Sequence, residues 1–165
     1  MKEHLIRTIS FVTWLVICTV IFHKLQIHAT WPAYLVVIFF FNSHFDISNL
    51  KSIFGGGAMG LVLGYTFPTI LGTLTPVMGP EYAFYALIAI TLLIILGLGP
   101  VAHYLFNPVT FAYSLLALIN IGEVQEQFFV WLTTHFIGGA LCIGGIYGVV
   151  KMMNKYLINE EKEAA

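Results

Sequence analysis

Residues 55–64 read GGGAMGLVLG, and this stretch sets three glycines four residues apart inside one apolar segment, namely Gly56, Gly60 and Gly64. Residues four apart lie on the same face of a helix. In lipid, where apolar burial no longer drives helix association, small residues on such a face let two backbones approach closely. The stretch therefore predicts a membrane helix that packs against a neighbour through its glycine face.

The same spacing of small residues recurs 84 residues later, in Ala140, Gly144 and Gly148. Each triplet follows a shorter apolar segment that opens with a proline, Pro32 in the first half and Pro108 in the second. A short proline-opened helix followed by a long helix, present twice, is typical of transporters and channels built from duplicated units. We expect the two long helices to meet near a pseudo-twofold axis through their small faces.

The composition places the chain in a membrane. Of its 165 residues, 59% are hydrophobic and only 9% are charged, with a mean hydropathy of +0.89. A soluble domain carries about 25% charged residues, so this chain cannot cover a surface in water. The net charge of −1 and the lack of a basic stripe argue against a nucleic-acid partner. Cys18 and Cys142 both lie in apolar runs, so a disulfide framework is not expected.

Six apolar runs follow one another, at about 5–22, 31–45, 52–74, 82–106, 108–121 and 127–150. A helix needs about 20 residues to cross a hydrocarbon core, and the second and fifth runs are shorter than that. We expect an all-α protein with six transmembrane helices, of which helices two and five are short or broken.

These helices are expected to form a single transmembrane domain over residues 1–165. Its two three-helix repeats cover about 5–74 and 82–152, and a tail follows at 153–165. Because three crossings per half reverse the side from which the second half enters, the repeats are expected to be inverted.

The distribution of basic residues predicts the orientation. With six crossings, one side receives Lys2, Arg7, Lys51, Lys151, Lys155 and Lys162. The other side receives only Lys24, together with Glu81, Glu123 and Glu126. Cytoplasmic loops carry an excess of Lys and Arg, so both termini and the tail are expected to be cytoplasmic.

A further pattern combines aromatic residues, glycines and an Asn-Pro dipeptide. It consists of Trp31, Tyr34, Phe40-Phe41, Lys51, Gly55 to Gly64, the run Phe106-Asn107-Pro108-Val109-Thr110-Phe111 and a glycine-rich last helix. In these features, over about residues 10–152, the chain resembles an uncharacterised family of small bacterial inner-membrane proteins, domain of unknown function 1097. The resemblance implies a bacterial inner-membrane location and a transport role, and it names no substrate.

The start of the fifth run offers candidate binding residues. Asn107 precedes a proline, which fits the first helical turn because it loses no hydrogen bond there. In one interpretation Asn107 is a plain N-cap that accepts bonds from backbone N–H groups. In the other, Asn107 and Thr110, with Ser114 one turn further, present polar groups and the positive end of the helix to a polar solute.

The densest polar cluster follows the second run, with Asn42, Ser43, His44, Asp46, Ser48 and Asn49. A carboxylate near an apolar zone is costly, so Asp46 is expected to face a cavity, a partner or the interface. One interpretation is a solvated turn that caps the next helix. The other places Asn42 and His44 at the mouth of a pore.

His135 lies about eight residues into the sixth run, roughly 12 Å from its outer end. An ionisable residue at that depth is a candidate functional residue, and histidine titrates near physiological pH. The alternative is a neutral imidazole that hydrogen-bonds across the bundle, to Thr13, Thr91 or Ser114. The sequence leaves both interpretations open.

Aromatic residues bear on lipid and subunit contacts. Trp31 is expected to be an aromatic anchor at the membrane interface. Five phenylalanines are expected either to face lipid or to pack between protomers of a homo-oligomer, namely Phe39, Phe40, Phe41, Phe128 and Phe129.

Metal and hydrolytic chemistry find little support. The sequence has no H-x-x-x-H or C-x-x-C spacing and no pair of carboxylates inside an apolar run. We therefore expect no enzyme activity, no cofactor and no metal site.

Two functions are compatible with the sequence. The first is a channel or secondary transporter in the lipid bilayer for a small polar solute, with a path lined by Asn42, Ser43, Asn107, Thr110, Ser114 and His135. The second is a non-transporting membrane subunit that docks a partner through its small helix faces. A solute path needs polar groups that converge in mid-membrane, whereas a docking subunit would fill that region with apolar side chains.

Overall fold

The computed structural model describes residues 2–149 and 151, and throughout this part the chain is helical, without a strand. The helices are α1 (Lys2–Lys24), α2 (Trp31–Asn42), α3 (Leu50–Met78), α4 (Pro80–Leu98), α5 (Pro108–Ile119) and α6 (Val124–Thr133). A 3-10 turn, η1 (Ile47–Asn49), precedes α3. A π-helical turn, η2 (Thr134–Gly138), follows α6 and leads into a helical continuation that reaches Val149. The expected tail 153–165, with Lys155 and Lys162, lies outside the described residues.

Glycine and proline explain where the helices end. α3 runs beyond the expected 52–74 and ends at Met78, where Gly79 caps it with a φ of 82° that suits glycine, and Pro80 then opens α4 in its first turn. The expectation of a helix over 82–106 is wrong at its end. α4 stops at Leu98 because Gly99 and Pro100 follow, and a loop leads to α5.

Three helical segments are long and apolar enough to cross a membrane, namely Ile47–Met78, Pro80–Leu98 and Val124–Val149. α2 and α5 have 12 residues each, which corresponds to about 18 Å along the helix axis. Both short helices begin with a proline in the first turn. The described part of the chain is thus all-helical, with three membrane-capable helices and three shorter apolar ones, namely Thr8–Lys24 of α1 and the equally long α2 and α5.

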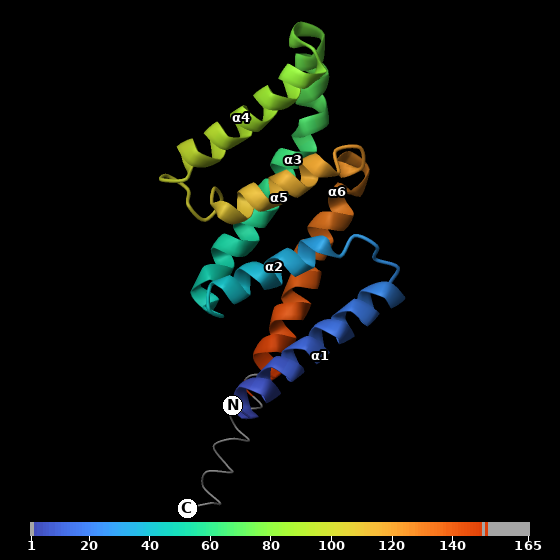
Figure 1. The fold of residues 1–165 in the computed structure, drawn as a ribbon, viewed down its shortest axis with the longest axis vertical. Helices are drawn as coiled ribbons and strands as arrows, with labels where there is room; N and C mark the ends of the chain where they lie inside the picture. Colours follow the sequence, from blue (N-terminus) through green and yellow to red (C-terminus); the bar gives the residue numbers. More distant parts are fainter. Residues whose placement is uncertain (1, 150, 152–165) are drawn as a thin grey trace, which may run out of the picture.

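The two short helices occupy the middle of the molecule (Figure 1). α5 packs along the first half of α3, and α2 packs on η2 and on α3. α4 turns back from the far end of α3 and packs on it. α1 lies along the helix that continues from η2, where the indole N–H of Trp14 donates to the carbonyl of Cys142 at 3.0 Å.

The glycine face of α3 packs on α5. A Cβ added at Gly56 would lie 2.6 Å from Oδ1 of Asn107, and one at Gly60 would lie 2.5 Å from Cβ of Tyr113. A Cβ at Gly64 would overlap the methyl group of Ala117. All three glycines are buried, so the close approach involves a short helix and not the long helix 124–149 that the sequence suggested.

The second triplet does not pack inside the chain, in contrast to the expectation. Ala140, Gly144 and Gly148 are exposed, and a Cβ at Gly144 or Gly148 would meet no atom of the described residues within 4 Å. A four-residue spacing names a face of a helix but does not say which way that face turns. Here the bulky, fully buried Trp131 and His135 turn their own face inward, and the triplet is left outside.

Other glycines of this helix make the close contacts. A Cβ at Gly138 would lie 3.0 Å from Cβ of Ala33, and one at Gly139 would lie 2.8 Å from Cγ2 of Val36. Both partners belong to α2. The helix 124–149 therefore approaches α2 through adjacent glycines, as α3 approaches α5.

These contacts give a matched pair of substitutions. We expect Gly64→Ala to lower the free energy of unfolding by about 1–3 kcal/mol, because the added methyl overlaps Ala117 in a packed interface. Gly144→Ala should leave stability unchanged or raise it by up to about 1 kcal/mol, because alanine favours the helix and the site is open. Thermal unfolding in mild detergent measures both, and equal losses would contradict the described packing.

Candidate functional site

His135 lies at the centre of the molecule and is completely buried. It belongs to the π-helical turn η2, and three other elements contact its side chain or its partners: α2, α3 and α5. π-helical turns insert an extra residue into a helix and occur frequently at functional sites. The imidazole is thus held where the two short helices meet the two long ones.

Two hydrogen bonds hold the imidazole ring. Nε2 lies 2.9 Å from the carbonyl oxygen of Phe54 in α3, and Nδ1 lies 2.8 Å from the hydroxyl of Tyr113 in α5. A carbonyl oxygen can only accept, so Nε2 carries a hydrogen and donates to Phe54. The Tyr113 hydroxyl is also in hydrogen-bond contact with the carbonyl of Pro32 at the start of α2, which accepts when the hydroxyl hydrogen points to it. The network therefore links four elements through two side chains, which we call the Tyr113–His135 pair.

A glycine allows the ring to sit against α3. A Cβ at Gly57 would overlap Cε1 of His135 and lie 2.9 Å from Nε2. Gly57 is buried, so a side chain there would displace the imidazole from both of its partners.

Aromatic rings surround the Tyr113–His135 pair. The ring centroid of Trp31 lies 5.7 Å from that of Tyr113 and 5.2 Å from that of Trp131. Trp31 is half-buried in this cluster, in the first turn of α2. The indole Nε1 of Trp131 is buried and has no hydrogen-bond partner within the described part of the chain.

Asn107 acts as a helix cap in this structure. Its Oδ1 accepts from the backbone N–H groups of Val109 at 2.8 Å and Thr110 at 3.3 Å, and the Thr110 hydroxyl completes a capping box. Its amide donates to the carbonyls of Ser52 at 3.1 Å and His103 at 2.9 Å. Asn107 thus joins α3 to α5, and all of its usual bonding positions are taken.

Thr110 and Ser114 also bond to the backbone. The hydroxyl of Thr110 donates to Leu105, and that of Ser114 donates to the carbonyl of Phe111 at 2.9 Å. Both side chains are buried. The hydroxyls of these two residues, which the sequence assigned to a solute path, are therefore engaged within α5 and the loop that precedes it.

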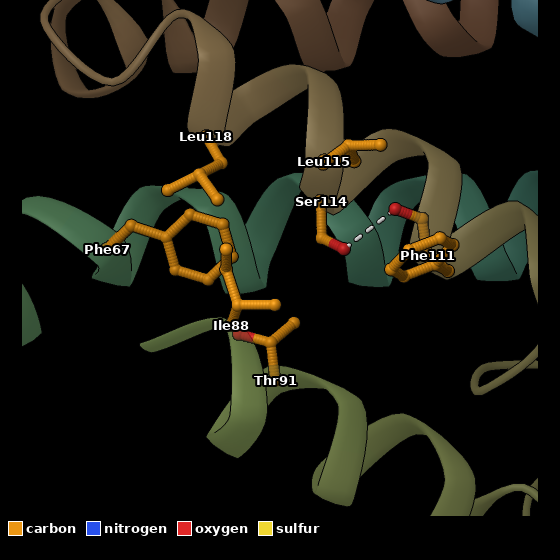
Figure 2. Close-up of a pocket in the computed structure, with 7 residues that line it drawn as sticks. All are labelled: Phe67, Ile88, Thr91, Phe111, Ser114, Leu115 and Leu118. Carbon is orange, nitrogen blue, oxygen red and sulfur yellow. Dashed lines mark hydrogen bonds between the residues drawn. The ribbon is translucent and has the colours of Figure 1, made fainter. Parts of the chain in front are cut away.

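Ser114 borders a small cavity between α3, α4 and α5 (Figure 2). The cavity has a volume of about 20 Å³, and its lining consists of Phe67, Ile88, Thr91, Phe111, Ser114, Leu115 and Leu118. The hydroxyl of Thr91 donates to the carbonyl of Leu87, and the hydroxyl of Ser114 donates to the carbonyl of Phe111. Both bonds lie within the residue's own helix, so the lining offers few free polar groups. The volume is close to that of one water molecule.

The polar cluster after α2 forms an exposed turn. Asn42 is exposed, and the Ser43 hydroxyl donates to the carbonyl of Phe40 at 2.8 Å. Asp46 accepts from the hydroxyl of Ser48 at 2.7 Å and from its backbone N–H at 2.9 Å. These bonds to Ser48 lower the pKa of the Asp46 carboxyl. The geometry matches a solvated turn at the start of α3.

The structure brings together only part of the expected path. His135 meets the first turn of α2 through Tyr113, whereas Asn42 and Ser43 stand at the opposite end of α2, about 15 Å along its axis. Tyr113 itself was not among the residues expected from the sequence. A signal existed, because Thr110, Tyr113 and Ser114 are three and four residues apart and share one face of α5.

Among the described residues, no group of three or more His, Cys, Asp or Glu side chains could hold a metal ion. The fold and the site together define an all-helical protein with three membrane-capable helices and a buried polar pair at its centre. No family model, no curated protein and no solved structure matches the chain.

The capping role of Asn107 is testable. We expect Asn107→Ala to lower the free energy of unfolding by about 1–2 kcal/mol, because the start of α5 loses its acceptor. Asn107→Ser keeps an acceptor oxygen but loses the amide bonds to Ser52 and His103, so it should fall between alanine and wild type. Thermal unfolding in detergent orders the three proteins. A wild-type midpoint for Asn107→Ala would disprove the cap.

Proposed function

We propose that this protein is a small membrane transporter, a channel or secondary transporter, that moves a small polar solute between two inverted three-helix repeats. The observation that carries the proposal is the buried Tyr113–His135 pair at the meeting point of α2, α3, α5 and η2. Polar and ionisable side chains are costly inside a membrane and mark functional sites there. A subunit that only docks a partner would gain more from apolar side chains at this position.

The pairing of elements supports inverted repeats. α2 and α5 have equal length and a proline in the first turn, and Pro108 follows Pro32 by 76 residues. Gly60 packs on α5, and Gly138, 78 residues later, packs on α2. In Figure 1, a half-turn about an axis through the centre brings α1, α2 and α3 onto α4, α5 and the helix 124–149. Equivalent positions in the two halves are therefore 76 to 78 residues apart. The offset of 84 that the sequence suggested is the distance between the two small-residue triplets, but the second triplet is exposed and does not correspond to the first.

The positions of the turns support six crossings with both termini cytoplasmic. In Figure 1, the turns at 25–30 and 120–123 lie on one side, and those at 43–49 and 99–107 on the other. The first side carries Lys24 and Glu123, and the second leads into Lys51. With six crossings, the sequence assigns only Lys24 to the first side and its other basic residues to the second, and such an excess is typical of a cytoplasmic face. We propose a bacterial inner membrane as the location, on the basis of the family resemblance.

The centre of the molecule is closed in this conformation. Tyr113, Trp131 and His135 are at most 1% exposed, and the cavity near Ser114 holds about 20 Å³. Transporters built from inverted repeats alternate between conformations by moving one bundle against the other around a fixed site. We propose that α2 and α5 separate to admit the solute to the Tyr113–His135 pair.

A docking subunit is the second candidate. It is favoured by the exposed small face of the helix 124–149, where Gly144 and Gly148 have open space beyond their Cα atoms. Small exposed faces let a second helix approach closely in lipid. A homo-oligomer that uses this face is compatible with either function.

The transport proposal is tested by flux through the purified protein in proteoliposomes. A panel of small amides, polyols and amines is presented, and swelling or uptake is measured between pH 5 and 8. We expect at least one solute to move, and we expect His135→Ala to reduce its rate about tenfold or to change the pH dependence.

The control is His28→Gln, because the His28 side chain is exposed and stands outside the pair. This variant should keep the wild-type rate. If no solute in the panel moves, the result favours the docking function over transport. If solute moves and His135→Ala has the wild-type rate and pH profile, while unfolding shows that it is folded, the assigned site is wrong.

A further inference from the structure

We propose that the Tyr113–His135 pair binds the proton that drives solute movement, so that the protein is a proton-coupled transporter. This inference rests on the proposed transport function and adds to it the identity of the coupling ion. The reason lies in the number of hydrogen atoms that the network needs.

Three contacts join the members of the network. The Tyr113 hydroxyl contacts the Pro32 carbonyl, the same hydroxyl contacts Nδ1 of His135 at 2.8 Å, and Nε2 of His135 contacts the Phe54 carbonyl at 2.9 Å. Each contact needs one hydrogen atom to be a hydrogen bond. The two carbonyls supply none, because they only accept.

The neutral network is one hydrogen short. A neutral imidazole carries a single N–H, which the Phe54 carbonyl requires at Nε2. The hydroxyl of Tyr113 has one hydrogen and faces two acceptors, the Pro32 carbonyl and the bare Nδ1. It can donate to only one of them at a time, so in the neutral state one of the three contacts has no hydrogen.

One added proton completes the network. In the imidazolium form Nδ1–H donates to the Tyr113 oxygen, the Tyr113 hydroxyl donates to Pro32, and Nε2–H still donates to Phe54. All three contacts then carry a hydrogen, and the two bonds from the ring become charge-assisted, which makes them stronger than neutral ones. The bonds offset part of the cost of holding a positive charge in the apolar centre.

The proton also controls how α2 is held. When His135 is protonated, the Tyr113 hydroxyl is committed to the carbonyl of Pro32, and the first turn of α2 is tied to α5. When the proton leaves, the hydroxyl turns to Nδ1 and this tie is lost. Proton binding and the position of α2 are therefore coupled through a single hydroxyl, which is the link that a coupled transporter requires.

The groups that face the pair have no compensating charge. The Pro32 carbonyl faces it from α2, the Phe54 carbonyl and Gly57 from α3, and the rings of Trp131 and Phe136 stand on its own helix. On the packed elements, the described side chains that are charged at neutral pH are Lys51, Glu123 and Glu126, near helix starts. Lys51 places its amine 4.6 Å from the ring centre of Tyr104. Proton binding here is thus set by the balance between the hydrogen bonds of the pair and the cost of placing a positive charge in an apolar centre.

The first experiment measures proton binding directly, without transport. Protein labelled with ¹⁵N-histidine in lipid nanodiscs is titrated from pH 8.5 to 5, and His135→Gln identifies the His135 signals by their loss. We expect a neutral ring with hydrogen on Nε2 at high pH and a second N–H at Nδ1 at low pH. Tyr113→Phe, which keeps the ring volume, should weaken proton binding about tenfold because the imidazolium loses an acceptor.

The second experiment measures coupling in the proteoliposomes used for the flux panel. A gradient with acid outside is imposed, and a pH-sensitive dye reports the lumen while each amide, polyol or amine is added. We expect uptake to rise with the gradient and the lumen to acidify as solute enters. Tyr113→Phe and His135→Gln should lose the gradient dependence, and His28→Gln should keep it.

The outcomes separate the two proposals. A His135 ring that keeps one protonation state from pH 8.5 to 5 overturns the proton site. Solute flux that ignores the gradient and leaves the lumen pH unchanged also overturns it, while the transport function stands. If no solute moves at all, the transport function fails and the coupling proposal fails with it. Should His135→Gln not fold, Tyr113→Phe alone decides, since it leaves the imidazole and the core volume in place.

Discussion

Close backbone approach along the first half of α3 is the constraint on which the rest of the structure depends. Gly60 and Gly64 let α5 lie directly on α3, which brings Tyr113 to the centre. Gly57, on the neighbouring face, leaves space for the imidazole of His135 from the opposite long helix. A side chain at any of these positions would separate the helices, and the hydroxyl of Tyr113 would no longer reach the ring. The helix packing and the position of the Tyr113–His135 pair therefore both depend on residues 55–64.

Local pattern was enough to predict much of the fold. Apolar runs bounded by Gly, Pro and polar turns gave the order of six helices, and prolines marked where the two short helices begin, because both signals depend on neighbouring residues. The end of α4 was misjudged because Gly99 and Pro100 outweighed the apolar residues that follow them. The inward face of the helix 124–149 was also misjudged, since spacing alone does not orient a helix.

The site was harder to predict because its contacts are distant in sequence. Tyr113 is 81 residues from Pro32 and 22 from His135, and no periodicity links such positions. The depth of His135 in an apolar run identified it as a candidate. The Tyr113–His135 pair, however, is held by two backbone carbonyls, that of Pro32 at Tyr113 and that of Phe54 at His135, and backbone carbonyls leave no mark in a sequence. Asn107, by contrast, was recognisable as a cap because capping is local.

The second half of α3 lacks some of the backbone hydrogen bonds that keep a helix straight. Pro68 and Pro76 lie inside this helix and supply no N–H, so the carbonyls of Gly64 and Gly72 lack their usual helical partner. Threonines 66, 73 and 75 donate to carbonyls of the preceding turn, an arrangement that tends to bend helices. Bending stiffness is therefore lowest beyond Gly64, outside the contact with Tyr113. In a chain that crosses the bilayer as proposed, bending at this point would let the half beyond Gly64 and α4 tilt to match membranes of different thickness, while the contacts of Gly57, Gly60 and Gly64 lie on the other side of the bend.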